Sequence, residues 1–290
     1  MSSIELKSRA KINLSIDVLG KREDGYHLVE MIMQTIDLYD IIKIKEIEID
    51  EININSNSSD IPLNENNIVY KAAKVLKDQF NIKNGVEIFI EKNIPVAAGM
   101  AGGSSNAAAV LVGLNKLWKL NLSEVRLQEI GLKLGADVPF CICGGTMLAT
   151  GIGENLSPLP ALPPCYIVIC KPSVSVSTQE AYQKADNCII LHRPDTQILC
   201  NALKEQNLSA VSQNMKNVFQ EAMALEDVHI ITELMIQNNA LGACMSGSGS
   251  AVFGIFETEQ KALFCSNILK QTFHHVFICK PTKHGVKSQS

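Results

Sequence analysis

The sequence predicts an α+β protein, and three observations lead to this fold class. Apolar residues alternate with polar ones through much of the first 56 positions, which is the period of strands. A loop rich in glycine and serine then separates a further alternating strand from an apolar helix. The second half interleaves strands with helices that would cover one face of a sheet, so we expect an α+β sandwich there.

Two domains are expected because a proline-rich segment lies near the middle of the 290-residue chain. Residues 155–165, NLSPLPALPPC, contain four prolines, a composition typical of a linker. We therefore predict an N-terminal domain over residues 1–157 and a C-terminal domain over residues 158–290.

The elements follow from the spacing of apolar residues. Ile12, Leu14, Ile16 and Val18 alternate with polar residues and predict a half-buried strand. In the first domain, further strands are expected within 29–38, 40–56 and 85–94, and helices over 68–80 and 122–134, the last with Ser123 as N-cap and Gly135 as its stop. In the second domain we expect a strand over 166–172, helices over 178–186, 195–213 and 226–238, two strands around a glycine turn within 242–256, a helix over 259–273 and a strand over 274–281.

Residues 95–106, PVAAGMAGGSSN, have the composition of an anion-binding loop. They lead into a helix that we expect to begin near Ser104, because Ala107, Leu111, Leu114 and Trp118 form one apolar stripe. The first N–H groups of a helix lack internal partners, and glycine lets a phosphate approach the backbone closely. The loop lacks the Gly-Lys-Ser/Thr ending of a P-loop, so an ordinary nucleoside triphosphatase is not indicated.

The overall composition favours a globular protein with a small-molecule substrate. Hydrophobic residues make up 46% of the chain and charged residues 19%. The net charge of −4 does not favour binding to nucleic acid or to an anionic membrane. The chain contains no apolar run long enough to span a bilayer and no signal-peptide core, so we expect a cytoplasmic location. Nine cysteines without a C-x-x-C pair indicate neither a disulfide framework nor a zinc site.

Several residues could take part in chemistry, although each also has a structural explanation. Lys11 and Asn13 project from the same face of the first strand, which could simply be solvated. Asp137 lies in a loop where an aspartate commonly forms a turn or caps a helix. Residues 24–27, DGYH, place an aromatic ring and an imidazole behind a turn, and residues 245–250, MSGSGS, could bind an anion or form a tight hairpin.

Four segments together resemble the motifs of the GHMP kinase superfamily: AKINLSIDVLGKREDGYH, PVAAGMAGGSSNAAAVL, LGADVPFCICGGT and MSGSGSAVF. The resemblance extends over about residues 7–280. Within the superfamily, KIN…DGYH and LGADVPF resemble the branch that phosphorylates a cytidylylated methylerythritol in the non-mevalonate isoprenoid pathway, rather than kinases of homoserine, mevalonate or galactose.

The resemblance implies a two-domain fold, with an N-terminal domain like the second domain of ribosomal protein S5 and a ferredoxin-like C-terminal domain. It implies an active site between them, ATP as phosphoryl donor and Mg²⁺. The catalytic places fall on Lys11 and Asp137, and the substrate-binding places on Asn13, Tyr26, His27, Thr178 and Tyr182, of which the two tyrosines would enclose the cytosine. The ATP-binding places fall on Asn67, Pro95, Val96, Ala97, Ala98, Gly99, Met100, Ala101, Gly102, Gly103, Ser104 and Ser105.

Two positions depart from the family pattern. Position 101 is alanine where glycine is common, which requires a negative φ there, and Arg9 replaces a small residue and is expected to point to solvent. The sequence identifies no acidic Mg²⁺ ligand, and Ser104 is the candidate that it offers. It does not indicate the oligomeric state.

Two other functions remain open at this stage. The chain could be another GHMP kinase acting on a different small alcohol, although DGYH and Tyr182 suit a planar base. It could also be a ligand-binding regulator that has lost catalysis, although it retains both Lys11 and Asp137.

Overall fold

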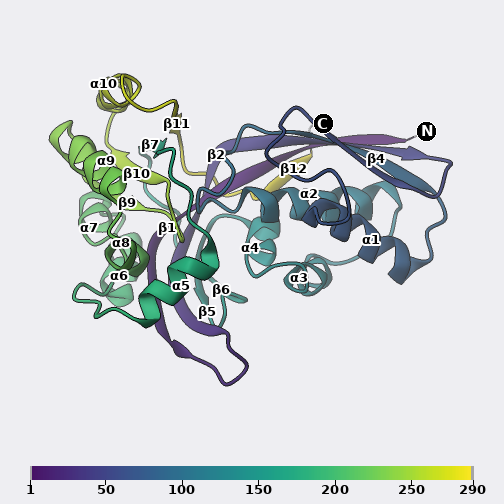
Figure 1. Ribbon diagram of the computed structural model, residues 1–290, viewed down its shortest axis with the longest axis horizontal. Helices are drawn as coiled ribbons and strands as arrows, with labels where there is room; N and C mark the ends of the chain where they lie inside the picture. Colours follow the sequence, from purple (N-terminus) through teal and green to yellow (C-terminus); the bar gives the residue numbers. More distant parts are fainter. Residues whose placement is uncertain (1, 289–290) are drawn as a thin grey trace.

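The structure, a computed structural model, describes residues 2–288 and builds from them one eight-stranded and one four-stranded sheet (Figure 1). The first sheet contains β1 (Ser3–Lys21), β2 (His27–Ile47), β3 (Ile52–Ser56), β4 (Gly85–Glu91), β5 (Thr146–Thr150), β6 (Asn155–Pro158), β8 (Lys216–Asn217) and β12 (Val286–Ser288). The second contains β7 (Tyr166–Lys171), β9 (Gly242–Met245), β10 (Val252–Phe256) and β11 (His275–Cys279).

The helices divide between the two sheets. The first group is α1 (Ile68–Phe80), α2 (Gly102–Leu117), α3 (Glu124–Leu132) and α4 (Val138–Cys143), and the second is α5 (Thr178–Asp186), α6 (Thr196–Lys204), α7 (Leu208–Gln213), α8 (Val218–Met223), α9 (Glu226–Gln237) and α10 (Glu259–Leu269). In the first group, α2 packs on β1 and β2 and is flanked by the other three helices. Figure 1 shows α6–α10 around the second sheet, at the opposite end of the molecule from α1.

The long hairpin of β1 and β2 connects the two halves of the molecule. The two strands pair antiparallel along almost their whole length, and irregularities near Arg9, Asn13 and Val18 bend the ladder. β4 pairs antiparallel with β2, and β3 runs parallel to β4. In the second sheet the order is β11-β7-β10-β9, and every pair is antiparallel.

Both faces of β1 are buried, so the prediction of a half-buried strand was wrong. Ile12 and Leu14 share a hydrophobic cluster with Phe253 of the second sheet. Asn13 and Ser15 are also fully buried. The reason is tertiary, because α2 and α4 of the first half and α8 of the second all contact this strand. The alternation along the strand therefore separates two packed surfaces and not a core from solvent.

The proline-rich segment joins the two sheets but is not a free linker. Leu162 and Cys165 are buried, and the backbone N–H of Leu162 donates to the hydroxyl of Thr146. All strands of the second sheet follow residue 158, whereas β8 and β12 return to the first sheet and pair with β1. The predicted boundary between residues 157 and 158 remains a prediction.

Most of the expected helices are present with shifted ends. Ser123 caps α3 as predicted, since its hydroxyl accepts from the N–H of Arg126. The helix expected over 195–213 is two helices, α6 and α7, because Gln206 adopts a φ of 54° between them. The short elements β5, β6, β8, β12, α4 and α8, of two to six residues each, were not predicted from the sequence.

Candidate active site

A cleft of about 880 Å³ contains nearly all the predicted site residues. Its walls come from β1, the two glycine-rich loops, the start of α1, the loop before α4 and the start of α5. Of the predicted residues, only Asn13 and Ser105 do not line it. Segments that are far apart in the sequence therefore meet at one site between the two halves of the chain.

Lys11 and Asp137 face each other in this cleft. The Nζ of Lys11 lies 3.6 Å from Oδ2 of Asp137 and donates to Oδ1 of Asn13 at 2.6 Å. The lysine side chain is 5% exposed, whereas that of Asp137 is 31% exposed. A buried ammonium held by an amide and a carboxylate is fixed in position, and the more accessible carboxylate can accept a proton from a bound hydroxyl.

Asp137 does not act as the helix cap that the sequence left open. It occupies the N-cap position of α4, yet its side chain forms no capping hydrogen bond with the described backbone. Pro139 in the first turn lacks an N–H, which removes one of the donors that a cap would satisfy. The carboxylate is thus available to the cleft.

Asn13 holds the side chain of Lys11 in place beside Asp137. Its side chain accepts from Lys11, its amide group contacts Sδ of Met31 at 3.3 Å, and its backbone N–H donates to the hydroxyl of Ser246 at 3.3 Å. Because Asn13 is fully buried beneath Lys11, the structure shows it as a support for the lysine. Its predicted contact with substrate is untested.

The two glycine-rich loops pack directly against each other. The hydroxyl of Ser246 donates to the carbonyl of Gly99 at 3.0 Å, and the N–H of Ala251 donates to the carbonyl of Ala98 at 3.3 Å. Gly99 has a φ of +71°, and a Cβ atom there would overlap the carbonyl oxygen of Ser246. Residues 247–249 also line the cleft, so both loops present backbone to the same space.

The expectation of a negative φ at Ala101 was wrong. Ala101 has a φ of 54° and Ala97 a φ of 51°, both in the left-handed region that L-residues other than glycine adopt at a cost. The same loop is joined to the second glycine-rich loop through the carbonyl of Gly99, which accepts from Ser246. The carbonyl of Ala101 accepts from the N–H of Ser105, so the residue still serves as the helix N-cap.

Arg9 does not simply point to solvent. Its guanidinium donates to the carbonyl of Gly285 at 3.4 Å, and burial lowers the pKa of the side chain. Its Nε atom is buried and, among the described residues, has no hydrogen-bond partner. Arg9 therefore packs against the C-terminal segment that leads into β12.

The two serines at the start of α2 point in different directions. Ser104 lines the cleft. Ser105 is fully buried, and its hydroxyl donates to the carbonyl of Arg9 at 2.6 Å and accepts from the hydroxyl of Ser8 at 2.8 Å. The side chain of Ser105 thus ties α2 to β1. A contact of Ser105 with ATP, which stays a prediction, would have to use its backbone.

Lys92 and Asp40 form a buried ion pair that no sequence pattern predicts. The Nζ of Lys92 lies 2.5 Å from Oδ2 of Asp40, and the two side chains are 5% and 0% exposed. Oδ1 of Asp40 also accepts from the N–H groups of Asn93 and Ile94. A Cβ atom at Gly102 would lie 3.2 Å from the ammonium, so this cation stands beside the start of α2 within the cleft.

Asn67 lines the cleft at the start of α1. Its Oδ1 accepts from the N–H of Val69 at 2.9 Å, and its amide group donates to the carbonyl of Pro62 at 2.6 Å. The residue is therefore the N-cap of this helix. A further contact with adenine is untested.

Aromatic residues gather where β2 begins and α5 passes. The rings of His27 and Tyr182 are stacked with centroids 4.4 Å apart, and the ring of Phe219 meets Tyr182 edge-on at 4.9 Å. Burial, together with the charge of Asp137, raises the pKa of Tyr182 to about 12, so its hydroxyl is neutral. Tyr26 is 60% exposed, and Thr178 lies 3.4 Å from Ser248 between their hydroxyl oxygens.

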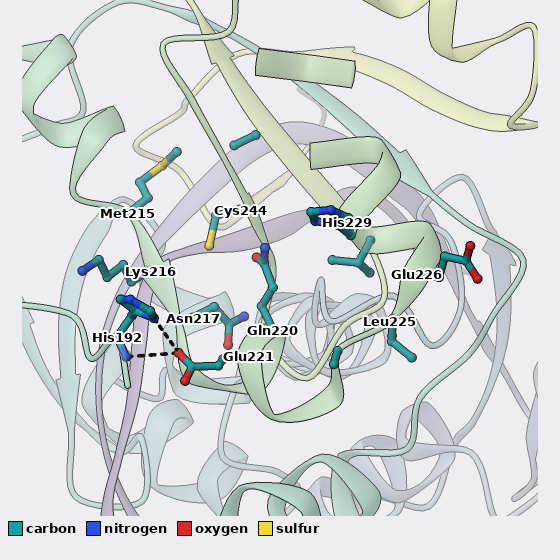
Figure 2. Close-up of a pocket in the computed structure, with 13 residues that line it drawn as sticks. His192, Met215, Lys216, Asn217, Gln220, Glu221, Leu225, Glu226, His229 and Cys244 are labelled. Atoms are coloured by element: carbon teal, nitrogen blue, oxygen red, sulfur yellow. Dashed lines mark hydrogen bonds and ion pairs between the residues drawn. The ribbon is translucent and has the colours of Figure 1, made fainter. Parts of the chain in front are cut away.

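A second cavity, of about 510 Å³, lies wholly within the second half (Figure 2). Figure 2 shows Glu221 joined to His192, whose backbone N–H and ring both contact the carboxylate. Asn217 donates to the carbonyls of Met245 and Gly247 at its edge. This cavity therefore borders the second glycine-rich loop but contains none of the predicted site residues.

Two family models match this chain. The model described as the GHMP kinase N-terminal domain matches residues 67–145, and that described as the GHMP kinase C-terminal domain matches residues 201–275. The first match spans the glycine-rich loop and Asp137, which lie in the cleft described above. Fold and site together define a small-molecule kinase of the GHMP class.

Curated relatives narrow this assignment. The 4-diphosphocytidyl-2-C-methyl-D-erythritol kinase of Clostridioides difficile is 58% identical over 290 residues, covering 99% of this chain and 98% of that protein. The enzyme of the same name from Alkaliphilus metalliredigens is 48% identical, covering 100% of this chain and 98% of its own length. The chain therefore belongs to the 4-diphosphocytidyl-2-C-methyl-D-erythritol kinase family.

Solved structures agree with the fold. A crystal structure of 4-(cytidine 5'-diphospho)-2C-methyl-D-erythritol kinase matches with a TM-score of 0.80 and 28% identity, covering 96% of this chain and 99% of that one. Homoserine kinase from Cytophaga hutchinsonii matches with a TM-score of 0.82 at 18% identity, covering 100% and 98%, which supports the fold alone. None of the helices in the described part of the chain is long and apolar enough to cross a membrane.

Proposed function

We propose that this protein transfers the γ-phosphoryl group of ATP to the 2-hydroxyl of 4-diphosphocytidyl-2-C-methyl-D-erythritol, giving the 2-phosphate and ADP. The observation that carries the proposal is the 3.6 Å approach of Lys11 Nζ to Asp137 Oδ2 beside the glycine-rich loop. Phosphoryl transfer depends on positioning and charge stabilisation more than on covalent help from the protein. A cytoplasmic location is part of the proposal.

Asp137 accepts the proton of the attacking hydroxyl. Its carboxylate is 31% exposed in the cleft, so a substrate oxygen can reach it. The neighbouring ammonium of Lys11 stabilises negative charge on the moving phosphoryl group. Asn13 keeps the ammonium aimed at this point, because it holds Nζ at 2.6 Å.

The first glycine-rich loop holds the phosphates of ATP. The start of α2 offers N–H groups without internal partners, and the dipole of the helix favours negative charge there. Lys92 adds a fixed positive charge beside Gly102. Asn67 and the start of α1 lie on the same cleft, where the base of ATP would fit.

Mg²⁺ fits this site as an ion held largely by the nucleotide. Within residues 2–288, no group of three or more His, Cys, Asp or Glu side chains could form a protein cage for a metal. Ser104 lines the cleft in the first turn of α2, so its side chain would hold the ion together with phosphate oxygens and water. When bound, Mg²⁺ neutralises charge on the phosphates.

The cytidine end of the substrate binds among His27, Tyr182 and Tyr26, with Thr178 as a polar contact at the start of α5. The elements that build this subsite, β2 and α5, differ from the loop that would hold the phosphates. Binding energy gained at the base can orient the reacting hydroxyl.

Measuring ADP release with a panel of alcohols tests the proposal. We expect rapid ADP release with 4-diphosphocytidyl-2-C-methyl-D-erythritol and Mg²⁺, and little with homoserine, mevalonate or galactose. Phosphorus NMR of the product should place the new phosphate on the 2-hydroxyl. A preference for another alcohol would favour a different GHMP kinase, and ATP binding without ADP release on any acceptor would favour a non-catalytic regulator.

A further inference from the structure

The imidazole of His27 is held on two sides by one helix. Its ring stacks on Tyr182 with an angle of 21° between the planes, and its Nε2 lies 2.8 Å from Oδ1 of Asp186. Tyr182 and Asp186 are four residues apart on α5, so their side chains share one face of the helix. The stack on Tyr182 fixes the plane of the His27 ring, and the contact with Asp186 fixes the rotation of the ring within that plane.

This contact crosses between the two halves of the molecule. His27 is the first residue of β2, whereas Asp186 is the last residue of α5, 159 positions later. The side chain of His27 is only 10% exposed, and the ammonium of Lys21, at the end of β1, lies 3.4 Å from Asp186 Oδ2. The imidazole is therefore preorganised at the rim of the cleft that it lines.

The carboxylate determines which nitrogen of His27 carries hydrogen. Burial alone would raise the pKa of Asp186, but the hydrogen bonds from His27 and Lys21 hold this pKa below its ordinary value. An ionised carboxylate can only accept, so Nε2 must be the donor. In the neutral ring, Nδ1 then keeps its lone pair, and no protein group in residues 2–288 hydrogen-bonds to it.

A hydrogen-bond acceptor at Nδ1 of His27 favours binding of cytosine over uracil. Cytosine presents an amino group at N4, which donates, whereas uracil presents a carbonyl oxygen at the equivalent position, which accepts. A site that supplies an acceptor binds the first and leaves two acceptors opposed with the second.

We propose that Asp186 is a positioning residue for base specificity: it fixes the Nε2–H tautomer of His27, so that Nδ1 accepts from the amino group of the substrate's cytosine. This inference rests on the proposed function, since it assigns the base of that substrate to the His27 edge. Asp186 is distinct from the groups that act on the phosphoryl group, because its carboxylate contacts His27 and Lys21.

The test compares Asp186→Asn with the parent on the cytidylyl substrate and on its uridylyl analogue. The amide of Asn can donate as well as accept, so it no longer imposes one tautomer. We expect KM for the cytidylyl substrate to rise about tenfold and the cytidylyl-to-uridylyl preference in kcat/KM to fall by a similar factor, the usual worth of one hydrogen bond in discrimination. The kcat at saturation and the affinity for ATP should stay within about threefold.

Glu233→Gln is the matched control. Glu233 lies 3.2 Å from Nε2 of His229 on the exposed side of α9, so the change removes the same kind of carboxylate–imidazole pair away from the cleft. It should leave KM and base preference unchanged. A similar loss in both variants would mean that a general charge effect, and not the tautomer of His27, explains the result.

Nitrogen NMR of ¹⁵N-histidine-labelled protein tests the tautomer without any substrate. At about pH 8.5 we expect His27 to show a protonated Nε2 and a bare Nδ1 in the parent, and a mixture of tautomers in Asp186→Asn. A bare Nε2 in the parent, or unchanged KM and base preference in folded Asp186→Asn, would overturn the inference. Failure of the proposed function would look different, because the parent itself would then release no ADP with the cytidylyl substrate.

Discussion

Ser246 and Gly99 join the two glycine-rich loops through a hydrogen bond of 3.0 Å between the serine hydroxyl and the glycine carbonyl, across 147 residues of sequence. The same serine accepts from the N–H of Asn13, directly below the Lys11 ammonium. One side chain thus links the first glycine-rich loop, β1 and the second half of the molecule. The active site therefore depends on the docking of these segments and not on any one loop.

Replacing Gly99 should destabilise the protein, whereas replacing Gly103 should mainly affect ATP. Gly99 has a φ of +71° and its Cβ would overlap the Ser246 carbonyl, so Gly99→Ala should lower the free energy of unfolding by about 2–4 kcal/mol. At Gly103 a Cβ would make only an ordinary contact, 3.7 Å from Ile68. Gly103→Val should therefore fold and weaken ATP more than the cytidylyl substrate, because a branched side chain would block the approach of phosphate.

Denaturant unfolding and separate calorimetric titrations of the two ligands measure these effects. A folded Gly103→Val variant with unchanged nucleotide affinity would place the phosphates elsewhere. Normal stability in Gly99→Ala would mean that the two loops are not packed as described.

Ala101→Gly should stabilise the protein. Ala101 is held at a φ of 54°, where glycine has no steric cost, and the relief should exceed the added entropy of the unfolded chain by about 0.5–1 kcal/mol. Ala98, in the same loop, is buried and does not have a positive φ, so Ala98→Gly should lower stability instead. Thermal unfolding of both variants checks the prediction, and a loss of stability in Ala101→Gly would contradict the left-handed backbone.

Asp40→Ala should be among the most destabilising single changes in the first half. It leaves the ammonium of Lys92 buried without its partner, which typically costs about 3–5 kcal/mol. Asp78→Ala breaks an exposed i,i+4 pair with Lys74 and should cost no more than about 0.5 kcal/mol. If urea unfolding gave similar small losses for the two variants, the charge of Lys92 would be solvated and not buried.

Tyr182→Ala should weaken the cytidylyl substrate by about ten- to a hundredfold, because an aromatic stack on a base contributes about 1–3 kcal/mol. Tyr182→Phe should largely preserve binding, since the hydroxyl is neutral and the ring supplies the contact with His27. ATP affinity should hardly change in either variant. Unaltered KM for the cytidylyl substrate in Tyr182→Ala would move the base out of this aromatic group.

The sequence predicted the parts of the site that have a local signature. The glycine-rich loop, the loop around Asp137 and the aromatic turn at Tyr26 were recognisable because a short run of residues carries each pattern. These segments line one cleft in the structure, although the role of each residue in binding stays a prediction.

Pairs formed by distant residues could not be predicted in this way. Lys92 and Asp40 are 52 positions apart, and His27 and Asp186 are 159 positions apart, so no local sequence pattern predicts either contact. The φ of Ala101 was predicted with the wrong sign for a related reason. Local propensity favours a negative φ for alanine, but Ala101 has a φ of 54° in the folded loop.

Asp137 and Lys11 are proposed to carry out phosphoryl transfer, and the kcat of Asp137→Asn at saturating substrates measures the contribution of this pair. We expect kcat to fall by about 10²–10⁴-fold, the usual worth of a positioned general base, while the fold and calorimetric ATP affinity are retained. Lys11→Met should act similarly, and the double variant should lose less than the product of the two single losses. A kcat for Asp137→Asn within threefold of the parent would mean that Asp137 is not the general base.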